Sequence, residues 1–360
     1  MKLRLSIPRV RARGVGLGNE LTSWARAFLA AQVVGAYALK PAFGLNKRRY
    51  WRHFGTPRYD WFLHQALEHL LPVVEFKEVD YLRHGGGNFV DAFRNFADVE
   101  RLHDRSCYLL VTEGMWGGYR HIADARDFVF STLYQSRFAA RNLLRIKQSL
   151  HSNKLVVGMH VRLGDFGAAP RDFSDYHGRF NLALPLFWYI NIAKSITTIL
   201  GDEVQFLVVS DGSSEQLKPL LDVIPAVTTT DIPDSDCSDL IALAKADLLV
   251  CSVSSYSAWA AFLSDAPYLW FEPNLQHHDS GHYSIWGHEP EQQKENSATQ
   301  RALLNHISLG DSNTGRGLPI GLDGVVPEGF LQSLVARREH LRIEADLVQY
   351  GVVPIRKVGG

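Results

Sequence analysis

The sequence has little cysteine, no excess of either charge and no long apolar run, and each absence removes a class of protein. Its three cysteines, Cys107, Cys237 and Cys251, form no Cys-x-x-Cys pair, so neither a disulfide framework nor a cysteine-based zinc site is indicated. Lys plus Arg and Asp plus Glu each number 38, so no overall field draws the chain to nucleic acid or to anionic lipid. We expect no nucleic-acid partner and at most peripheral contact with a membrane.

The longest apolar stretch does not have the length of a membrane span. Residues 24–39 (WARAFLAAQVVGAYAL) contain Arg26 and Gln32 and fall short of the roughly 20 apolar residues that a spanning helix needs. The first residues lack the apolar core of a signal peptide. Together with the low cysteine content, this predicts a soluble protein of the cytoplasm.

The composition is that of a globular protein of about two domains. The chain has 360 residues, of which 46% are hydrophobic and 21% charged. In the first part, the pattern predicts a strand at 3–10, a glycine-rich turn, a helix through about residue 38, and helices at 59–71 and 126–150. The polar break HSNK at 151–154 marks the expected domain boundary.

After that break, strands and helices alternate regularly. Strands are expected at 154–162, 203–211, 226–231, 247–253 and 266–273, and helices at 185–200, 213–224, 239–246 and 256–264. A further helix is expected at 328–348. This alternation is typical of an α/β protein with a parallel sheet covered on both faces.

Polar residues gather where three of these strands end, at His160–Asp165, Ser210–Gly212 and Ser252–Ser257. Open parallel sheets bind ligands beyond the carboxyl ends of their strands. His160 and Arg162 alternate with Val161 and are expected on one face, where the guanidinium fork suits a phosphate. The alternative is an ion pair between arginine and aspartate within the turn, with His160 bonded to a backbone carbonyl.

Two other stretches are suited to anions or to close backbone approach. VSSYS at 253–257 precedes a helix, whose first N–H groups and hydroxyls would form an anion site; simple helix capping by Ser254 or Ser255 is the alternative. GVGLGNE at 14–20 imitates a dinucleotide loop, but Asn19 occupies the third glycine position and no acidic residue closes a second strand. The sequence of this loop therefore argues against NAD binding.

Three weaker motifs have ordinary explanations. LRHGG at 82–86 is similar to the Arg-His-Gly of histidine phosphatases but follows a polar segment instead of a buried strand. The segment 277–288 holds five potential metal ligands in what reads as a solvated loop: His277, His278, Asp279, His282 and His288. LNKRRYWRHF at 45–54 is basic and aromatic, which fits a solvated face or contact with an anionic acceptor or membrane surface.

Four segments in order resemble the GDP-fucose-dependent fucosyltransferases. HVRLGDF (160–166), FLVVSDG (206–212) and the run from Ser238 to Leu263 resemble the three shared signatures of that superfamily. GLGNEL (16–21) resembles its Gly-x-Gly-Asn-Gln loop, and VSSYSAWAAFL is similar to patterns of both the alpha-1,2 and the protein O-fucosyl enzymes. The resemblance covers about residues 14–30 and 155–265.

This resemblance implies a GT-B architecture, an α/β fold of two Rossmann-like domains facing a central cleft. Residues 1–150 would form the acceptor-side domain, 151–290 the nucleotide-sugar-binding domain and 291–360 a partly helical extension. The implied activity is inverting, metal-independent transfer of fucose from GDP-fucose to a hydroxyl of a glycan or glycoconjugate. The alternatives are a transferase for another nucleotide sugar, and a non-catalytic relative that binds a glycan or nucleotide.

The resemblance also assigns roles to residues. Arg162 would bind the departing diphosphate, His160 would contact the donor, and Asp165 or Glu20 would serve as the base. The remaining donor contacts would be Gly16, Gly18, Asn19, Asp211, Asp239, Ser254, Ser255 and the Tyr256 backbone, with Asp239 near the guanine. No cofactor or metal is implied, because the arginine and a helix N-terminus stabilise the charge on the β-phosphate.

Overall fold

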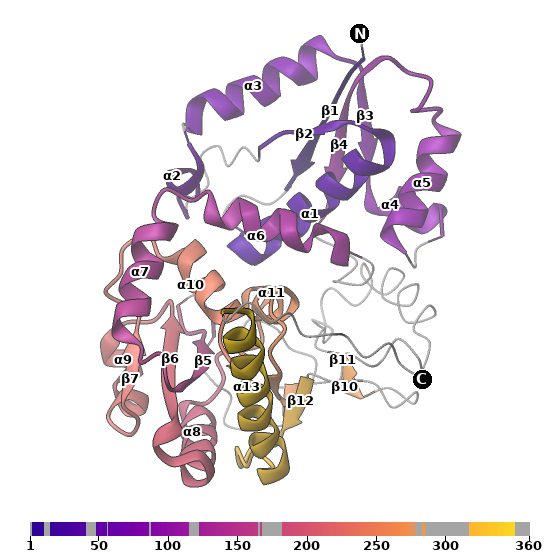
Figure 1. Cartoon of the computed structure of the whole chain (residues 1–360). Coiled ribbons are helices and arrows are strands. Elements are labelled where there is room, and N and C mark those ends of the chain that lie inside the picture. Colours follow the sequence, from indigo (N-terminus) through magenta and orange to yellow (C-terminus); the bar gives the residue numbers. More distant parts are fainter. Residues whose placement is uncertain are drawn as a thin grey trace, which may run out of the picture.

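The protein consists of two parallel sheets with helices packed on them (Figure 1). The computed structural model describes residues 2–10, 15–40, 48–55, 57–85, 88–114, 122–164, 166–167, 182–274, 276–277, 283–284 and 317–349. Its parallel sheets confirm the predicted α/β class. Among these residues no helix is long and apolar enough to cross a membrane.

The first sheet has four strands in the order β2-β1-β4-β3, all parallel. The strands are β1 (Leu3–Arg9), β2 (Tyr37–Ala38), β3 (Val73–Phe76) and β4 (Cys107–Glu113). Helices α1 (Leu17–Val34), α2 (Trp51–Phe54), α3 (Pro57–Leu70), α4 (Glu78–Arg83), α5 (Phe89–Val99) and α6 (Arg126–Tyr134) accompany it. Helix α7 (Ala139–Ser149) follows and packs against α10 (Asp236–Ala244) of the second half (Figure 1). The central strand β4 contributes to both faces of this sheet: Tyr108 and Leu110 join the core that α1 covers, and Leu109 and Val111 form a smaller cluster with Ile7 of β1.

Two predicted helices end earlier than expected. Gly35 closes α1 in the left-handed conformation, with φ of 62°, and its N–H bonds to the carbonyls of Ala31 and Gln32, so the chain turns into β2 before residue 38. The predicted helix at 126–150 is divided into α6 and α7. At the break the Arg137 N–H leaves the helical pattern and donates to the His53 carbonyl of α2 at 3.0 Å.

The second sheet has six parallel strands in the order β12-β9-β8-β5-β6-β7. They are β5 (Leu155–Val161), β6 (Val204–Ser210), β7 (Ala226–Thr228), β8 (Leu248–Val250), β9 (Tyr268–Phe271) and β12 (Gly317–Ile320). The helices of this half are α8 (Leu186–Leu200), α9 (Ser214–Leu221), α10 (Asp236–Ala244), α11 (Ser255–Leu263) and α13 (Glu328–Gln349). All the strands and helices predicted after residue 154 are confirmed. A short antiparallel pair, β10 (Gln276–His277) and β11 (Tyr283–Ser284), stands apart.

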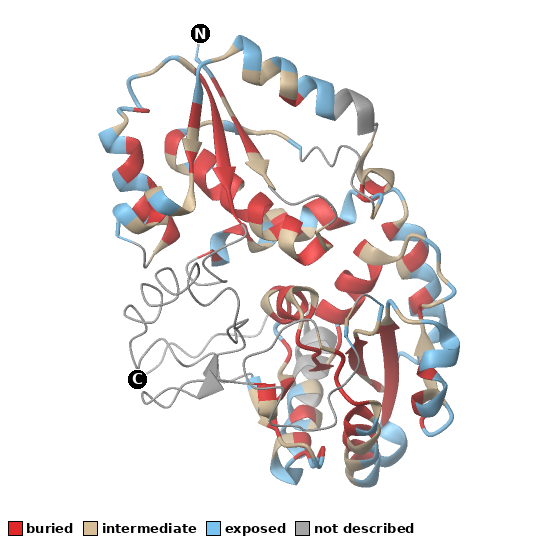
Figure 2. Ribbon diagram, turned by 180° about the vertical axis from the view of Figure 1, so that it is seen from behind, coloured by how far each residue is buried: buried red, intermediate tan, exposed pale blue. Residues whose placement is uncertain are grey.

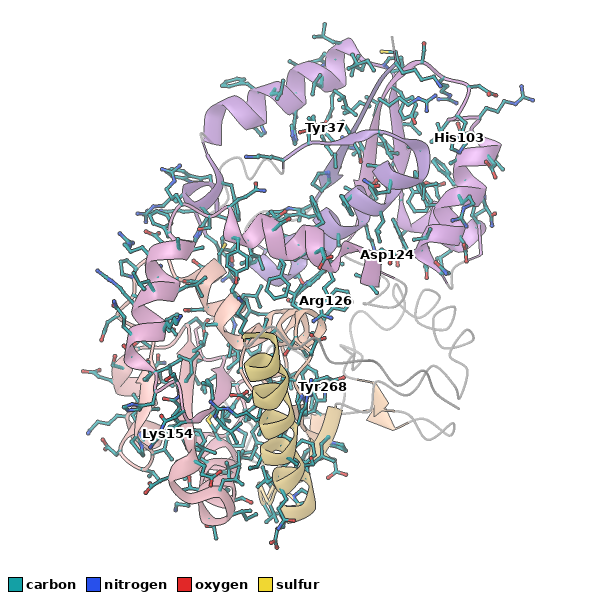
Figure 3. All side chains as sticks on the ribbon, viewed as in Figure 1. Tyr37, His103, Asp124, Arg126, Lys154 and Tyr268 are labelled. Atoms are coloured by element: carbon teal, nitrogen blue, oxygen red, sulfur yellow. The ribbon has the colours of Figure 1, made fainter. Side chains whose placement is uncertain are left out.

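The two halves share one apolar core. Figure 2 shows buried residues running from the first sheet through α1 and α6 into α10 and α11, and one hydrophobic cluster includes side chains from all of these elements. Arg126, labelled in Figure 3, reaches from α6 to the Leu263 carbonyl at 2.6 Å and to the Asp265 carboxylate at 2.9 Å. The division into domains at residue 150 stays a prediction.

Candidate active site

The carboxyl ends of three neighbouring strands bring the predicted polar residues together. In the sheet β5 lies between β8 and β6, and Val161 is opposite Ser210 in the register. His160 and Arg162 at the end of β5 therefore lie beside Asp211 after β6 and beside the loop that leads from β8 into α11. We call that loop, Ser252–Ser257, the serine loop.

His160 is buried and held by the serine loop. Its Nδ1 lies 2.7 Å from the Ser257 hydroxyl and 2.9 Å from the Ser252 hydroxyl. Its ring packs against the Tyr256 ring, with the centroids 4.8 Å apart. The imidazole therefore has one orientation, which is fixed by the loop that follows the neighbouring strand β8.

Burial, and then the neighbouring Arg162 guanidinium, lower the pKa of His160 to about 3. The imidazole is therefore neutral at pH 7 and can exchange hydrogen bonds but supplies no positive charge. Any anion at this edge must be balanced by Arg162 and by the partial charge of a helix end.

Arg162 is held in place by a carboxylate from the next strand. Its Nη1 lies 2.5 Å from Asp211 Oδ2, while Asp211 Oδ1 accepts the backbone N–H groups of Leu163 at 2.9 Å and Gly164 at 3.0 Å. The guanidinium also stacks at 5.0 Å over the Phe166 ring. Within the described residues Asp211 is a partner of Arg162. The predicted alternative pairs this arginine with Asp165 of its own turn, which lies outside the described residues, so that alternative stays open.

The serine loop caps α11 and presents the start of that helix to the same edge. Ser254 is the N-cap, and its hydroxyl accepts the Ser257 N–H at 3.2 Å, so the capping alternative is part of the structure. The Ser252 N–H donates to the Ser257 hydroxyl at 2.9 Å. Because the first N–H groups of a helix have no carbonyl partner within it, the capped end still suits an anion.

The glycine-rich loop from the first half closes on α11. Gly16 is the N-cap of α1, and a side chain at Gly18 would come within 2.6 Å of the Ser255 hydroxyl. The Trp259 indole N–H of α11 donates to the Gly18 carbonyl at 2.6 Å. The structure thus places Gly18 against Ser255 of the serine loop, and only glycine fits at position 18. Asn19 is half-buried in the same turn of α1.

Asp239 in the first turn of α10 is buried with half of its carboxylate unmatched. Its Oδ2 accepts the hydroxyls of Ser235 at 2.7 Å and Thr229 at 3.0 Å, while its Oδ1 is buried without a hydrogen-bond partner. Burial raises the pKa of the Asp239 carboxyl to about 8, against the lowering effect of these two hydrogen bonds. A buried acceptor without a donor is costly, and a ligand N–H would remove that cost.

Three residues support the site in roles that the sequence did not assign. Ser252 and Ser257, at the two ends of a predicted polar stretch, orient His160, and the Tyr50 hydroxyl accepts the Leu17 N–H at 2.9 Å. Burial, and then the charge of Asp236, raise the pKa of Tyr50, against the opposing charges of Arg48 and Arg162. Tyr50 belongs to the basic aromatic segment at 45–54, whose aromatic content was the available signal.

The weaker motifs do not gather at this edge. His84 is the C-cap of α4, and its ring meets the Phe96 ring edge-on. Of the histidine-rich segment only His277 is described, as part of β10, and the other four residues lie outside the described ranges. Within those ranges no group of three or more His, Cys, Asp or Glu side chains is placed to hold a metal ion.

Comparisons with known proteins give no family model and no curated relative for this chain. Among solved structures, it is similar to the fucosyltransferase NodZ from Bradyrhizobium, with 15% identity over 73% of this chain and 94% of NodZ and a TM-score of 0.44. A variant of Arabidopsis thaliana FUT1 in complex with GDP shows 13% identity over 74% and 70%, with a TM-score of 0.41. POFUT1 in complex with GDP-fucose shows 13% identity over 74% and 94%, also at 0.41. At these values the likeness assigns no role to any residue of the site, so the functional argument rests on the site's own contacts.

Proposed function

We propose that this protein is a cytoplasmic glycosyltransferase that transfers fucose from GDP-fucose to a hydroxyl of a glycan or glycoconjugate, with inversion and without a metal ion. The observation that carries the proposal is the convergence of Arg162, neutral His160 and the α11 N-terminus at one strand edge. The four sequence signatures that resemble fucosyltransferases fall on this edge and on the loop that closes over it.

The chemistry requires stabilisation of a diphosphate that gains charge as the bond to the sugar breaks. Arg162, fixed by Asp211 and Phe166, would donate to the β-phosphate without having to reorganise. The first N–H groups of α11 would add the partial positive charge of the helix end. His160 would contribute a hydrogen bond from the nitrogen that faces away from the serine hydroxyls.

Asp239 would recognise the nucleotide base by a hydrogen bond. Guanine offers N–H donors from its ring and from its amino group. The raised pKa of Asp239 lets the free carboxyl keep a proton at pH 7, and on binding the carboxyl would release that proton to solvent so that Oδ1 accepts a guanine N–H. The base that deprotonates the acceptor hydroxyl would be Glu20, buried in the first turn of α1, or Asp165. In this account the first sheet's half, residues 1–150, faces the acceptor, and residues 151–290 hold the donor.

A donor screen tests the proposal. Purified protein is incubated with GDP-fucose, other GDP-sugars, UDP-sugars and ADP-sugars, and released nucleotide and transferred sugar are measured with and without EDTA. We expect GDP release from GDP-fucose that survives EDTA, and an inverted anomeric configuration of the product by NMR.

Each of the other outcomes would indicate a different function or mechanism for this protein. Turnover of another nucleotide sugar alone would overturn the fucose assignment, and GDP binding without hydrolysis or transfer would indicate a non-catalytic relative. Loss of activity in EDTA that Mn²⁺ restores would overturn the metal-free step.

A further inference from the structure

Helix α3 carries its apolar residues on the outside. Trp61, Phe62, Leu63 and Leu70 are 44%, 59%, 49% and 77% exposed, whereas Leu67 packs inward against the first sheet. A surface helix ordinarily turns charged residues to water. From residue 61 to 70 the only carboxylate is Glu68, which pairs with Arg9 at 3.0 Å, and there is no Lys or Arg.

A group of cations lies beside the beginning of this helix. The guanidinium groups of Arg52, Arg137 and Arg141 surround the Phe138 ring, at 5.8, 6.0 and 5.7 Å from its centroid. Arg145 and Lys147 extend the group along α7 and are exposed. Of these five, Arg52 pairs with Asp234 at 2.8 Å, and the other four have no carboxylate within ion-pair distance among the described residues. Residues 128–164 contain no Asp or Glu.

Hydrogen bonds fix the two features on one flank. The Arg137 backbone donates to the His53 carbonyl at 3.0 Å, and its side chain donates to the Gly55 carbonyl at 3.1 Å. Helix α3 begins two residues beyond Gly55, at Pro57, so Trp61 lies about one turn into the helix. In Figure 1, α3, α2 and α7 follow one another down the same side of the molecule. Leu144, 55% exposed, lies between the cations of α7.

We propose that this flank docks on the surface of an anionic phospholipid bilayer. The outer face of α3 would lie at the boundary of headgroups and acyl chains, where tryptophan and other amphipathic or apolar side chains are favoured. Arg137, Arg141, Arg145 and Lys147 would lie on the lipid phosphates. A second copy of the chain fits this flank less well, because a symmetric contact would bring two like-charged groups together. The inference is independent of the sugar nucleotide.

Vesicle sedimentation of the full chain tests the inference. We expect sedimentation with vesicles of phosphatidylcholine and phosphatidylglycerol, little with phosphatidylcholine alone, and release as salt is raised. The variant Arg141→Gln/Arg145→Gln should bind about 30-fold more weakly, at about fivefold for each cation lost. The variant Trp61→Ser/Phe62→Ser should bind at least about tenfold more weakly.

Matched variants on other surfaces distinguish vesicle binding by this flank from nonspecific binding. Val79→Ser/Val99→Ser removes apolar side chains that are 54% and 68% exposed. Arg94→Gln/Lys218→Gln removes exposed cations. Both control variants should bind the vesicles like the wild type. Circular dichroism confirms that every variant is folded. Equal sedimentation with neutral and anionic vesicles, or wild-type binding by both flank variants, would overturn the inference. A dimer in light scattering that Trp61→Ser/Phe62→Ser dissociates would overturn it in favour of a second copy.

Discussion

The two ends of the candidate donor site differ in how completely their polar groups are matched. At the end near β5, the His160 Nδ1 and Arg162 have partners in the protein, from the serine loop and from Asp211. At the end near α10, Asp239 keeps one carboxylate oxygen buried without a partner. The first end has its partners within the protein, whereas in the proposed account a bound nucleotide would supply the partner missing at the second.

This difference separates catalysis from recognition. Preorganised donors around a developing anion lower the barrier because they need no reorganisation during the reaction. An unmatched buried acceptor discriminates between ligands, because a ligand without the complementary donor leaves it unmatched. We therefore expect changes near β5 to act on kcat and changes at Asp239 to act on nucleotide affinity and selectivity.

The largest expected effect is that of Arg162. Arg162→Ala should lower kcat by about 10²–10³, the range for loss of one preorganised donor to a developing anion. Arg162→Lys keeps the charge but loses the planar fork, so it should bind GDP yet turn over poorly. Initial rates at saturating donor measure both.

Leu163→Ala is the matched control for Arg162. Leu163 packs against the core cluster of the second sheet, so its truncation should lower stability by about 1–3 kcal/mol and leave kcat per folded molecule little changed. Near-normal kcat in Arg162→Ala would mean that the pair with Asp211 is structural.

The next largest effect is that of Asp239→Asn on recognition. An amide offers a donor where the account needs an acceptor, so GDP should bind about 10- to 100-fold more weakly. Calorimetric titration with GDP measures the loss, and kcat at saturating donor should change much less. An unchanged affinity for GDP would place the guanine elsewhere.

Loss of the serine support should have a moderate effect. Ser257→Ala removes the hydroxyl that contacts His160 Nδ1 and accepts the Ser252 N–H, and should cost about 1–3 kcal/mol of unfolding free energy. Ser131→Ala, on an exposed turn of α6, is the control and should cost far less. Urea unfolding compares the two; equal costs would contradict the proposed support.

The smallest expected effect is on the pH dependence of stability, which should differ between the His160 end and the Asp239 end of the site. The folded pKa of Asp239, about 8, lies above its usual value, so its contribution is present at low pH and is lost as pH rises toward 8. The folded pKa of His160, about 3, lies below its usual value, so its contribution is lost as pH falls below about 6.5. Each slope should be about 1 kcal/mol per pH unit.

Variants of Asp239 and His160 show which residue causes each slope. Between about pH 4 and 6.5 the two slopes have opposite signs and largely cancel in the wild type. Asp239→Asn should therefore remove the decline of unfolding free energy that remains between about pH 6.5 and 8, and His160→Asn should remove the decline that remains below about pH 4. Urea unfolding at several pH values makes the measurement. A decline above pH 6.5 that persists in Asp239→Asn would mean that another group titrates there.

The sequence predicted five of the six strands of the second sheet, all but the edge strand β12, but only one strand of the first sheet. Strands such as β5 and β6 are buried on both faces and read as apolar runs between helical segments. Strands β3 and β4 were missed, although β4 is central, because the short apolar run at 107–113 follows a mixed region without regular alternation. The pairing of β4 with β1 joins residues about a hundred positions apart, which no local pattern encodes.

In the site, residue types at strand ends could be predicted but their partners could not. His160, Arg162 and the serine loop follow from strand and helix boundaries. The pairing of Arg162 with Asp211 depends on the register of β5 and β6, and the unmatched Oδ1 of Asp239 depends on the packing around α10. Both are properties of the tertiary structure.

The most direct test of the account is thermal unfolding with GDP and with UDP. Both nucleotides offer a diphosphate to Arg162 and the α11 N-terminus, but only GDP offers the donors that match Asp239. At 100 times its dissociation constant GDP should stabilise the protein by about 2.7 kcal/mol, and UDP at the same concentration by much less. Equal stabilisation by both nucleotides, or none by GDP, would contradict the account.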